Sequence, residues 1–378
     1  MNLHILNDEK FFDPFVKKLE ELDLLDNNIF IVKENGPLKF IKRKDLVHGR
    51  LNNKLLLGDV SKYDKVFIHA FSFDLYRWVN QHTFNELNWM IWGKELYESK
   101  MVNYPLYERR TKAIIQRIKK VRPVMSNYYR KAEQFFFQID IERVYSKINY
   151  LLTWITPEYE YAITHIKGLK AKHKNFAYTF EIDTETLSTM YDGEAFFKNQ
   201  REGNLRCIIG NSGASSNNHF DALEKVRAVN FKEITMPVSY GDQEYVTHLK
   251  KEIQKRYTDK NITFVHEFMD FENYLHFFNS YDVFVSNSLR PIGMGNIWVA
   301  LLTGKLVFMN SKNLVFPYLQ SLGLQLYDVN HIDRLDHIQH KVDFESNRTI
   351  ALRFLSKYRI DELYNSLFGK VEKKVEWS

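Results

Sequence analysis

The sequence predicts an α/β protein of two domains, each a parallel sheet covered by helices. Short runs of apolar, β-type residues alternate with helical stretches along most of the chain, which is the pattern of parallel sheets with helices on both faces. The length of 378 residues exceeds what one compact core usually holds. Hydrophobic residues make up 44% of the chain, which is enough for two such cores.

The predicted strands fall into two groups. The first group is residues 3–6, 29–32, 66–69, 89–92, 150–155 and 176–180, and the second is residues 205–209, 233–238, 262–265, 283–286 and 306–309. Helices are predicted between most of them, for example over residues 218–226, 244–257 and 271–279. Ligands of such sheets bind beyond the carboxyl ends of the strands, so the loops after the strands are the places to search for a site.

A looser pattern over residues 186–204 predicts the boundary between the domains. We expect an N-terminal Rossmann-like domain over residues 1–190 and a C-terminal Rossmann-like domain over residues 200–345. The last stretch, residues 346–378, is expected to form helices that pack back towards the N-terminal domain.

The composition of the chain indicates its cellular compartment and the charge of its partners. No apolar run approaches the roughly 20 residues that a membrane span needs, and residues 1–10 lack the apolar core of a signal peptide. The single cysteine, Cys207, excludes an internal disulfide and lies in an apolar run, so we interpret it as a buried core residue. We expect a cytoplasmic protein whose net charge of +6 favours anionic partners.

Seven basic residues and no acid lie within residues 109–122, with apolar residues between them at helical spacing. The basic residues are Arg109, Arg110, Lys112, Arg117, Lys119, Lys120 and Arg122. Such a helix either packs on a core with its charges in solvent, or binds anionic lipid head groups or a diphosphate. The sequence leaves both interpretations open.

A loop of small and polar residues, Asn211-Ser212-Gly213, follows the predicted strand 205–209, and a helix is expected to begin near Asn217. The backbone amides and positive dipole at a helix start suit a phosphate, and Gly213 lets the backbone approach closely. An ordinary strand-to-helix turn has the same pattern.

A second glycine loop follows the predicted strand 283–286. Gly293 and Gly295 lie where a helix from about Met294 is expected to begin. Arg290 has no acidic neighbour in this loop, and its guanidinium can bind a diphosphate through two hydrogen bonds, the alternative being a solvated loop charge. Two such loops in one domain fit a nucleotide diphosphate better than either loop alone.

Tyr240 and Gly241 follow another predicted strand between these two loops. They can contact the base or the ribose of a nucleotide, although packing explains Tyr240 equally well.

In the N-terminal half, His69 and the pair Trp92-Gly93 each end a predicted strand. Both should point to the same edge of the sheet, where His69 can take a proton from a hydroxyl near neutral pH. Glu95 is the other candidate base. Trp92 and Tyr97 can stack on sugar rings, but a histidine or an aromatic residue at a strand end is often structural.

The sequence lacks the motifs of zinc enzymes, metal-dependent transferases and hydrolases. No His/Cys cluster has the spacing of a zinc site. The carboxylate pairs at 140–142 and 181–183 are not framed by an apolar strand and a small-residue turn, so we interpret them as surface charges. The Gly-x-Ser-x-Gly pattern of hydrolases is absent.

Four motifs resemble those of the 4-acetamido-4,6-dideoxygalactose transferases, a family also called 4-alpha-L-fucosyltransferases, which builds enterobacterial common antigen. The motifs are Trp92-Gly-Lys-Glu-Leu-Tyr, Gly210-Asn-Ser-Gly-Ala-Ser-Ser-Asn-Asn-His, Pro237-Val-Ser-Tyr-Gly and Arg290-Pro-Ile-Gly-Met-Gly-Asn. The resemblance implies a GT-B fold, in which two Rossmann-like domains face a cleft, and a metal-independent reaction without a cofactor. It also implies a dTDP-sugar donor and a polyprenyl-diphosphate-linked saccharide acceptor at the inner face of the membrane.

More distantly, the glycine loop of residues 293–295 looks like that of large GT-B families. Those families carry one Glu before the loop and another within the helix. This chain departs from that pattern, because it has Arg290 before the loop and Ala300 in the helix.

We therefore expect a cytoplasmic, peripheral membrane glycosyltransferase that adds a sugar, an amino-deoxy sugar by the resemblance, to a lipid-linked glycan for O-antigen, capsule or a similar polymer. The expected donor residues are Asn211, Ser212, Gly213, Tyr240, Gly241, Arg290, Gly293, Met294, Gly295 and Asn296. Arg290 is also expected to stabilise the leaving diphosphate, and His69 or Glu95 to be the base. Trp92, Gly93 and Tyr97 are expected to bind the acceptor, and the basic helix to bind the anionic inner-membrane surface.

Two alternatives remain open, and no nucleic-acid partner is expected. A sugar-nucleotide 2-epimerase of GT-B shape would need acidic residues at the site and no lipid acceptor. A non-enzymatic basic module for a membrane surface or nucleic acid would suit the basic helix, but would leave the two glycine loops without a task.

Overall fold

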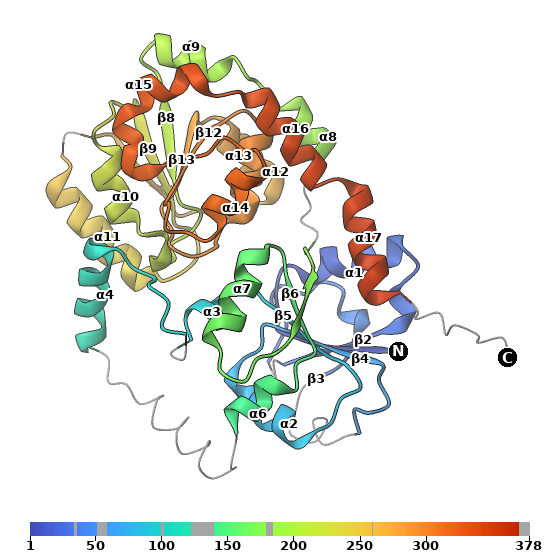
Figure 1. The fold of residues 1–378 in the computed structure, drawn as a ribbon. Helices are drawn as coiled ribbons and strands as arrows, with labels where there is room; N and C mark the ends of the chain where they lie inside the picture. The colour runs from blue at the N-terminus through green and yellow to red at the C-terminus, as the bar shows by residue number, and fades with distance from the viewer. Residues whose placement is uncertain are drawn as a thin grey trace. The chain divides into compact units, whose positions relative to one another are not determined.

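The computed structural model describes residues 1–33, 36–50, 59–99, 102–121, 140–178, 184–258 and 260–369. Its contacts divide the chain into two compact units. The first unit contains Met1–Tyr104, Met125–Glu181 and Ser356–Ser378, and the second contains Pro105–Val124 and Ile182–Leu355. The described residues therefore change unit four times along the chain, at 104/105, between 121 and 140, between 178 and 184, and at 355/356. Figure 1 draws the elements of both units.

The first unit is built on a parallel sheet whose described strands number seven, in the order β3-β2-β1-β4-β5-β6-β7. They are β1 (Asn2–Leu6), β2 (Asn28–Val32), β3 (Val47–Arg50), β4 (Lys65–His69), β5 (Leu87–Met90), β6 (Tyr150–Thr153) and β7 (Lys172–Asn175). Because every pairing is parallel, the carboxyl ends of all these strands lie at one edge.

The described α-helices of the first unit include the last helix of the chain. They are α1 (Phe12–Glu21), α2 (Tyr76–Gln81), α3 (Lys94–Tyr97), α6 (Ile141–Ser146), α7 (Thr156–His165) and α17 (Lys357–Phe368). Apolar side chains of α1 and α17 pack in one aromatic core with those of β2 and β4, among them Phe15, Phe30, Phe67 and Phe368. Of the C-terminal helices, α17 groups with the first unit and α16 with the second.

The second unit has a parallel sheet whose described strands number six, in the order β10-β9-β8-β11-β12-β13. They are β8 (Arg206–Ile209), β9 (Glu233–Pro237), β10 (Ile262–Val265), β11 (Val283–Ser286), β12 (Leu306–Met309) and β13 (Tyr327–Asp328). The central strands β11 and β12 are buried at every residue, as expected for strands with helices on both faces. Val283 and Val285 belong to the main core of the unit, while the ring of Phe284 contacts Phe278 of α12 with centroids 5.4 Å apart.

Most helices of the second unit follow its strands. The described ones are α4 (Arg109–Val121), α8 (Thr184–Thr189), α9 (Ala195–Arg201), α10 (His219–Val226), α11 (Gln243–Arg256), α12 (Phe271–Asn279), α13 (Met294–Leu302), α14 (Val315–Ser321), α15 (Leu335–Ile338) and α16 (Phe344–Phe354). Helix α13 begins at Met294, as predicted. No helix in the described ranges is long and apolar enough to cross a membrane.

Helix α4 groups with the second unit, whereas a division at residue 190 would place it in the N-terminal domain. Its apolar residues Ile114, Ile115 and Ile118 are buried in the same core as side chains of α10 and α11. Asp221 of α10 accepts hydrogen bonds from the backbone amides of Arg110 and Thr111, both at 2.8 Å. A carboxylate from a neighbouring helix therefore caps the first turn of α4, where the amides lack intrahelical acceptors.

The strands predicted from sequence are confirmed except for residues 176–180. There the strand, β7, ends at Asn175, and residues 179–180 lie outside the described ranges. Strands β3, β7 and β13 were not predicted. All three lie at or next to a sheet edge, and β7 carries the polar sequence Lys172-His-Lys-Asn, which has no apolar run to reveal it.

Replacing Ile118 by alanine should lower the free energy of unfolding by roughly 2–5 kcal/mol, because a buried side chain is lost from the core. The measurement is urea denaturation followed by circular dichroism. Gln116→Ala changes an exposed position of the same helix and is the control. Equal stability of the two variants would mean that α4 does not pack on this core in solution.

Candidate functional site

Both sheets reverse their strand order at one place. Numbered from its own first strand, each sheet has the order 3-2-1-4-5-6, with one further edge strand in the first unit. This is the Rossmann order, and its ligands bind where the order reverses, beyond the carboxyl ends of strands 1 and 4. A ligand is therefore expected at the loops after β8 and β11 in the second unit, and at those after β1 and β4 in the first.

In the second unit, the loops after β8 and β9 meet through two glycines. Gly213 and Gly241 form an isolated parallel bridge, with the Gly213 amide donating to the Tyr240 carbonyl at 2.6 Å. A Cβ atom on Gly241 would lie 2.6 Å from the carbonyl carbon of Gly213. The close backbone approach predicted at Gly213 therefore occurs, and it is made to the neighbouring loop.

The loop after β11 reaches the loop after β8 at Gly293. This residue has φ +67°, and a Cβ atom on it would lie 3.0 Å from the Cγ atom of Asn211. Gly293 caps α13, so the first amides of this helix, at Met294 and Gly295, lie next to the Asn211 loop. The two glycine loops predicted from sequence are thus brought together where the strand order reverses.

The helix after the first glycine loop, α10, begins within two residues of the predicted start. A single 3-10 turn, Ser215–Asn217, precedes α10, and the residue that caps α10 is Asn218. Asn218 has φ +51°, and its side chain accepts from the amide of Glu108 at 2.9 Å. Ser212 is buried, and Asn217 donates to its carbonyl oxygen at 2.9 Å.

Arg290 is not the solvated loop charge that the sequence left open, because only 7% of the residue is exposed. The Nη1 of Arg290 donates to the carbonyl of Pro291 at 3.2 Å. The side chain of Asn313 donates to the backbone carbonyl of Arg290 at 2.9 Å. The Arg290 backbone is further held by Ser288. The guanidinium is therefore fixed in a packed loop next to the start of α13.

Tyrosines and amides surround the same edge. Tyr240 is 44% exposed, and Asn211 lies 3.4 Å from its hydroxyl. Asn296, in the first turn of α13, donates to the hydroxyl of Tyr274 at 2.7 Å. Burial, and after it the neighbouring Tyr240, raises the pKa of Tyr274 above its usual range. These side chains can donate or accept hydrogen bonds but carry no charge at neutral pH.

Sequence reasoning did not identify Glu108, which holds the ends of β11 and β12. Lys225 donates to its carboxylate at 2.9 Å, Asn287 at 2.7 Å and Asn310 at 3.2 Å. Asn287 and Asn310 directly follow β11 and β12. Because Glu108 lies about 180 residues away from Asn287 in the chain, no local pattern indicated this contact.

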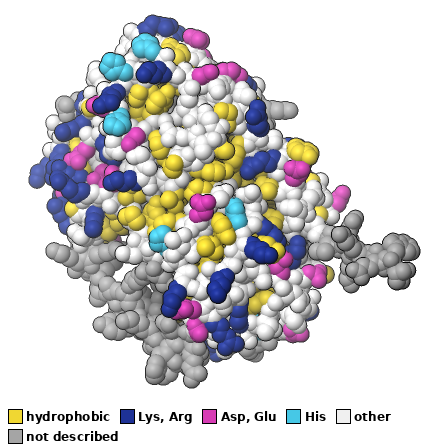
Figure 2. Space-filling model, in the orientation of Figure 1, with side chains coloured by type: hydrophobic (Ala, Val, Ile, Leu, Met, Phe, Trp, Pro, Cys, Tyr) yellow, Lys and Arg dark blue, Asp and Glu magenta, His cyan; other side chains and the backbone are white. Residues whose placement is uncertain are grey.

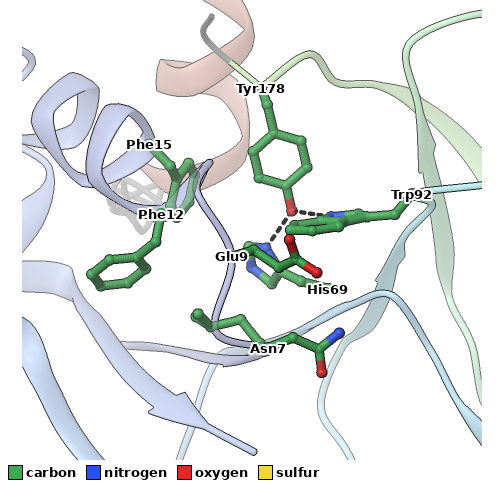
Figure 3. Close-up of a pocket in the computed structure, with 8 residues that line it drawn as sticks. Asn7, Glu9, Phe12, Phe15, His69, Trp92 and Tyr178 are labelled. Carbon is green, nitrogen blue, oxygen red and sulfur yellow. Dashed lines mark hydrogen bonds between the residues drawn. The ribbon is translucent and has the colours of Figure 1, made fainter. Parts of the chain in front are cut away.

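In the first unit, a small pocket lies at the corresponding place. It is lined by Leu6, Asn7, Glu9, Phe12, Phe15, His69, Trp92 and Tyr178. Figure 3 shows the Glu9 carboxylate close to the Tyr178 hydroxyl in this view, and the negative charge of Glu9 contributes to the raised pKa of Tyr178. His69 and Trp92 are thus brought together as predicted, while Glu9 and Tyr178 were missed. The polar run Asn7-Asp-Glu directly after the first strand was the signal available for Glu9.

His69 is 2% exposed and is part of a chain of hydrogen bonds. Tyr178 contacts its Nδ1 through the hydroxyl, and His4 Nδ1 lies 2.9 Å from its Nε2. His4 Nε2 in turn lies 2.9 Å from Asn28 Oδ1. Trp92 Nε1 donates to the Tyr178 oxygen at 2.7 Å. Figure 3 shows the two bonds at the pocket end.

The direction in which each hydrogen bond of this chain is donated follows from the orientation of Asn28 at its interior end. Asn28 donates through Nδ2 to the carbonyl of Leu24 at 2.7 Å, so its Oδ1 faces His4 and accepts. His4 then carries its proton on Nε2 and accepts on Nδ1 from His69 Nε2. His69 Nδ1 is left to accept from the hydroxyl of Tyr178. Both histidines are therefore neutral in this arrangement.

The surroundings of the histidines keep them neutral. Burial lowers the pKa of His4 to about 3, with the bond to Asn28 offsetting part of the effect. Burial, and after it the proximity of His4, lowers the pKa of His69 well below its usual range. Burial also raises the pKa of Tyr178 well above 10. His69 therefore has its lone pair occupied and a low proton affinity, which disfavours a direct role as base.

The other residues predicted for the N-terminal site have structural partners. Glu95 accepts from the backbone amide of Trp92 at 2.8 Å and from Trp89 Nε1 at 3.3 Å. Gly93 caps α3 with φ +98°. Tyr97 is buried and donates to Glu158 at 3.1 Å, so it does not present a face to a sugar.

The apolar face of α4 is buried, which favours the interpretation as a helix packed on a core. Arg110 pairs with Glu224 at 2.9 Å and Arg117 with Glu252 at 3.1 Å. Arg109 and Lys112 are exposed, whereas the side chains of Lys119 and Lys120, and all of Arg122, lie outside the described part. Figure 2 shows Lys and Arg side chains gathered over the edge where α11 and α4 lie in Figure 1. Contact of this surface with lipid stays a prediction.

Among the described residues, no group of three or more His, Cys, Asp or Glu side chains could hold a metal ion. Metal independence itself stays a prediction.

The neutral histidines should make stability depend on pH. In the unfolded chain a histidine takes up a proton near pH 6.5, whereas folded His4 does so only near pH 3, so its contribution is complete at high pH and is lost as the pH falls. Between about pH 7.5 and 5.5 the loss is about 1.4 kcal/mol for each such histidine. Urea denaturation at both values should show His4→Gln losing about 1.4 kcal/mol less than the wild type. An unchanged pH dependence in this variant would contradict a neutral, buried His4.

Solved structures similar to this chain share its fold. HepE from Anabaena in complex with UDP has 11% identity and a TM-score of 0.62, and the match covers 97% of this chain and 99% of that one. The E. coli trehalose-6-phosphate protein bound with UDP-2-fluoro glucose has 10% identity and a TM-score of 0.58, covering 98% and 99%. Sucrose-phosphate synthase from Thermosynechococcus elongatus has 11% identity and a TM-score of 0.56, covering 97% and 96%.

The match to a protein family spans both glycine loops of the second unit. Residues 184–360 match the family described as 4-alpha-L-fucosyltransferase glycosyl transferase group 56. This span contains the loops after β8, β9 and β11, and confirms the resemblance seen in the motifs. The matched span is just under half of the chain, and together with the fold that the chain shares with the solved structures it shows that the protein is a glycosyltransferase with the GT-B fold.

Proposed function

We propose that this glycosyltransferase takes an amino-deoxy sugar from a nucleotide diphosphate donor, a dTDP-sugar, and adds it to a lipid-linked saccharide in the synthesis of a bacterial surface polysaccharide. The observation that carries the proposal is the meeting of the two glycine loops at Asn211 and Gly293, where the strand order of the second unit reverses. The UDP complexes of HepE and the UDP-sugar complex from E. coli support a nucleotide donor.

In this proposal the second unit binds the donor. The first amides of α13 and the Asn211 side chain offer hydrogen bonds to the diphosphate. Arg290, fixed next to them, stabilises the charge that grows on the diphosphate as it leaves. The exposed ring of Tyr240 offers a face to the base or ribose.

In the same proposal the first unit binds the acceptor, and Glu9 is the base. Glu9 lines the pocket, and burial together with the bond from Tyr178 disfavours His69 as the base. The Glu9 carboxylate takes the proton of the acceptor hydroxyl while the acceptor oxygen bonds to the anomeric carbon. The bond from that carbon to the diphosphate oxygen breaks, and the nucleoside diphosphate leaves with its electron pair.

The membrane part of the proposal rests on charge. The acceptor would be a polyprenyl-diphosphate-linked saccharide at the inner face of the cytoplasmic membrane. Arg109 and Lys112 on α4 are exposed and can attract anionic lipid. The described isoleucines of α4 are buried in the core and are therefore not available for insertion into lipid.

The alternatives differ in what they require. A 2-epimerase needs acidic residues that its substrate can reach at the nucleotide site, whereas Glu108, the carboxylate at the ends of β11 and β12, is engaged by Lys225, Asn287 and Asn310. It would turn over free sugar nucleotide without an acceptor. A basic binding module would show no response to nucleotides.

Nucleotide binding is tested by thermal denaturation with dTDP, UDP and GDP compounds. We expect the melting temperature to rise most with the dTDP compounds. Arg290→Gln should weaken the best binder about tenfold or more, because a charge-assisted hydrogen bond contributes about 1.5–3 kcal/mol. Arg227→Gln, at an exposed position, should bind normally. The absence of any shift in the wild type would refute the proposed donor site.

The base is tested with Glu9→Gln. Transfer should slow by a factor of about 10²–10⁴, the usual contribution of a general base, while nucleotide affinity stays normal. Glu21→Gln, at an exposed position of α1, is the matched control. Normal turnover in Glu9→Gln would remove Glu9 from this role and leave the donor site unaffected.

A further inference from the structure

The pocket of the first unit has room for very little. Its cavity volume is about 10 Å³, which is about what one water-sized group occupies. A whole sugar ring does not fit such a space, but one hydroxyl group of a sugar does. The chemistry of the pocket wall then decides which kind of group can enter.

The Tyr178 oxygen can only accept a hydrogen bond from a ligand. Its proton is committed to His69 Nδ1, and Trp92 Nε1 already donates to one of its lone pairs. One lone pair remains. This orientation is fixed from the interior, because the chain through His69 and His4 ends at Asn28, whose amide is held by the carbonyl of Leu24.

The charge of the pocket wall disfavours anions. Glu9 is the charged residue among the lining side chains, which include no Lys or Arg. His69 could supply a positive charge only by taking a proton in the buried interior, where it would also have to break the bond from Tyr178. A carboxylate or phosphate oxygen would therefore meet the Tyr178 oxygen and the negative carboxylate of Glu9, both of which only accept hydrogen bonds there.

We propose that this cavity is a subsite for one hydroxyl group of the acceptor sugar, which donates a hydrogen bond to the Tyr178 oxygen and so places the sugar beside Glu9. Tyr178 is the specificity-determining residue, and His69, His4 and Asn28 are positioning residues that orient its hydroxyl. The inference rests on the proposed function, since it assigns the pocket to the acceptor. A chain of polar side chains in a core is costly unless every member has a hydrogen-bond partner. The subsite explains why this chain is present, since the chain orients the Tyr178 hydroxyl.

The orientation of the chain is tested on the full-length protein by nitrogen-15 NMR of its histidines. His4 and His69, assigned with His4→Gln and His69→Gln, should both be neutral with the proton on Nε2 and should not titrate between about pH 5 and 8. Tyr178→Phe should shift the Nδ1 signal of His69. Tyr159→Phe, whose hydroxyl donates to the carbonyl of Ala171, is the control. A proton on Nδ1 of either histidine, or titration near 6.5, would overturn the arrangement.

The subsite is tested with neutral methyl glycosides of glucose, galactose, mannose and N-acetylglucosamine, and with glucuronate as an anionic probe. At least one glycoside should shift the signals of His69 and the Trp92 indole. Its dissociation constant should rise about three- to tenfold in Tyr178→Phe, as expected for one hydrogen bond between uncharged groups, and stay unchanged in Tyr159→Phe. No shift with any glycoside, or equal affinity in Tyr178→Phe, refutes the subsite, as does glucuronate shifting these signals more than the glycosides.

The two proposals fail separately. Thermal stabilisation by nucleotides in the same samples reports on the donor site alone. If nucleotides stabilise the protein and glycosides leave the pocket unperturbed, the subsite is wrong and the donor site stands. If glycosides bind and no nucleotide does, the donor part of the proposed function is wrong and the subsite stands.

Discussion

Three loops of the second unit can meet because their backbones carry no Cβ atoms at the points of contact. Gly213 and Gly241 bring the loops after β8 and β9 into a backbone bridge, and Gly293 allows the loop after β11 to reach Asn211. The parallel sheet brings these loops to one edge, but only the glycines let them touch. Gly293, which makes this contact, also caps α13, so the first amides of that helix lie beside the Asn211 loop.

In the first unit, polar side chains and not glycines occupy the place where the strand order reverses. It carries a polar chain from Asn28 to Trp92 through a core of phenylalanines, where each polar group needs a partner. The chain satisfies every ring nitrogen of its two histidines, and its open end is the oxygen of Tyr178. The two units thus use one strand order for different purposes, a backbone-lined edge in one and a small side-chain pocket in the other.

The sequence predicted the strands with apolar runs and the pairing of the two glycine loops, because both are local patterns. It did not reveal edge strands such as β7, whose side chains are polar. It made His69 a candidate base, beside Glu95, because the end of a strand indicates where a side chain lies but not its hydrogen-bond partners. Those partners, His4 and Tyr178, lie 65 and 109 residues away in the chain. Glu108 was missed for the same reason.

The course of the chain between the units limits how this enzyme can be recombined. Residues 105–124 belong to the second unit although residues of the first unit lie on both sides of them in the chain, and α17 returns to the first unit at the end. A single crossover near residue 190 would separate α4 from the α10 and α11 surface that it covers. An exchange of the second unit between relatives must therefore transfer two separate segments, one that contains α4 and one that runs from α8 to α16, and leave α17 with its original core.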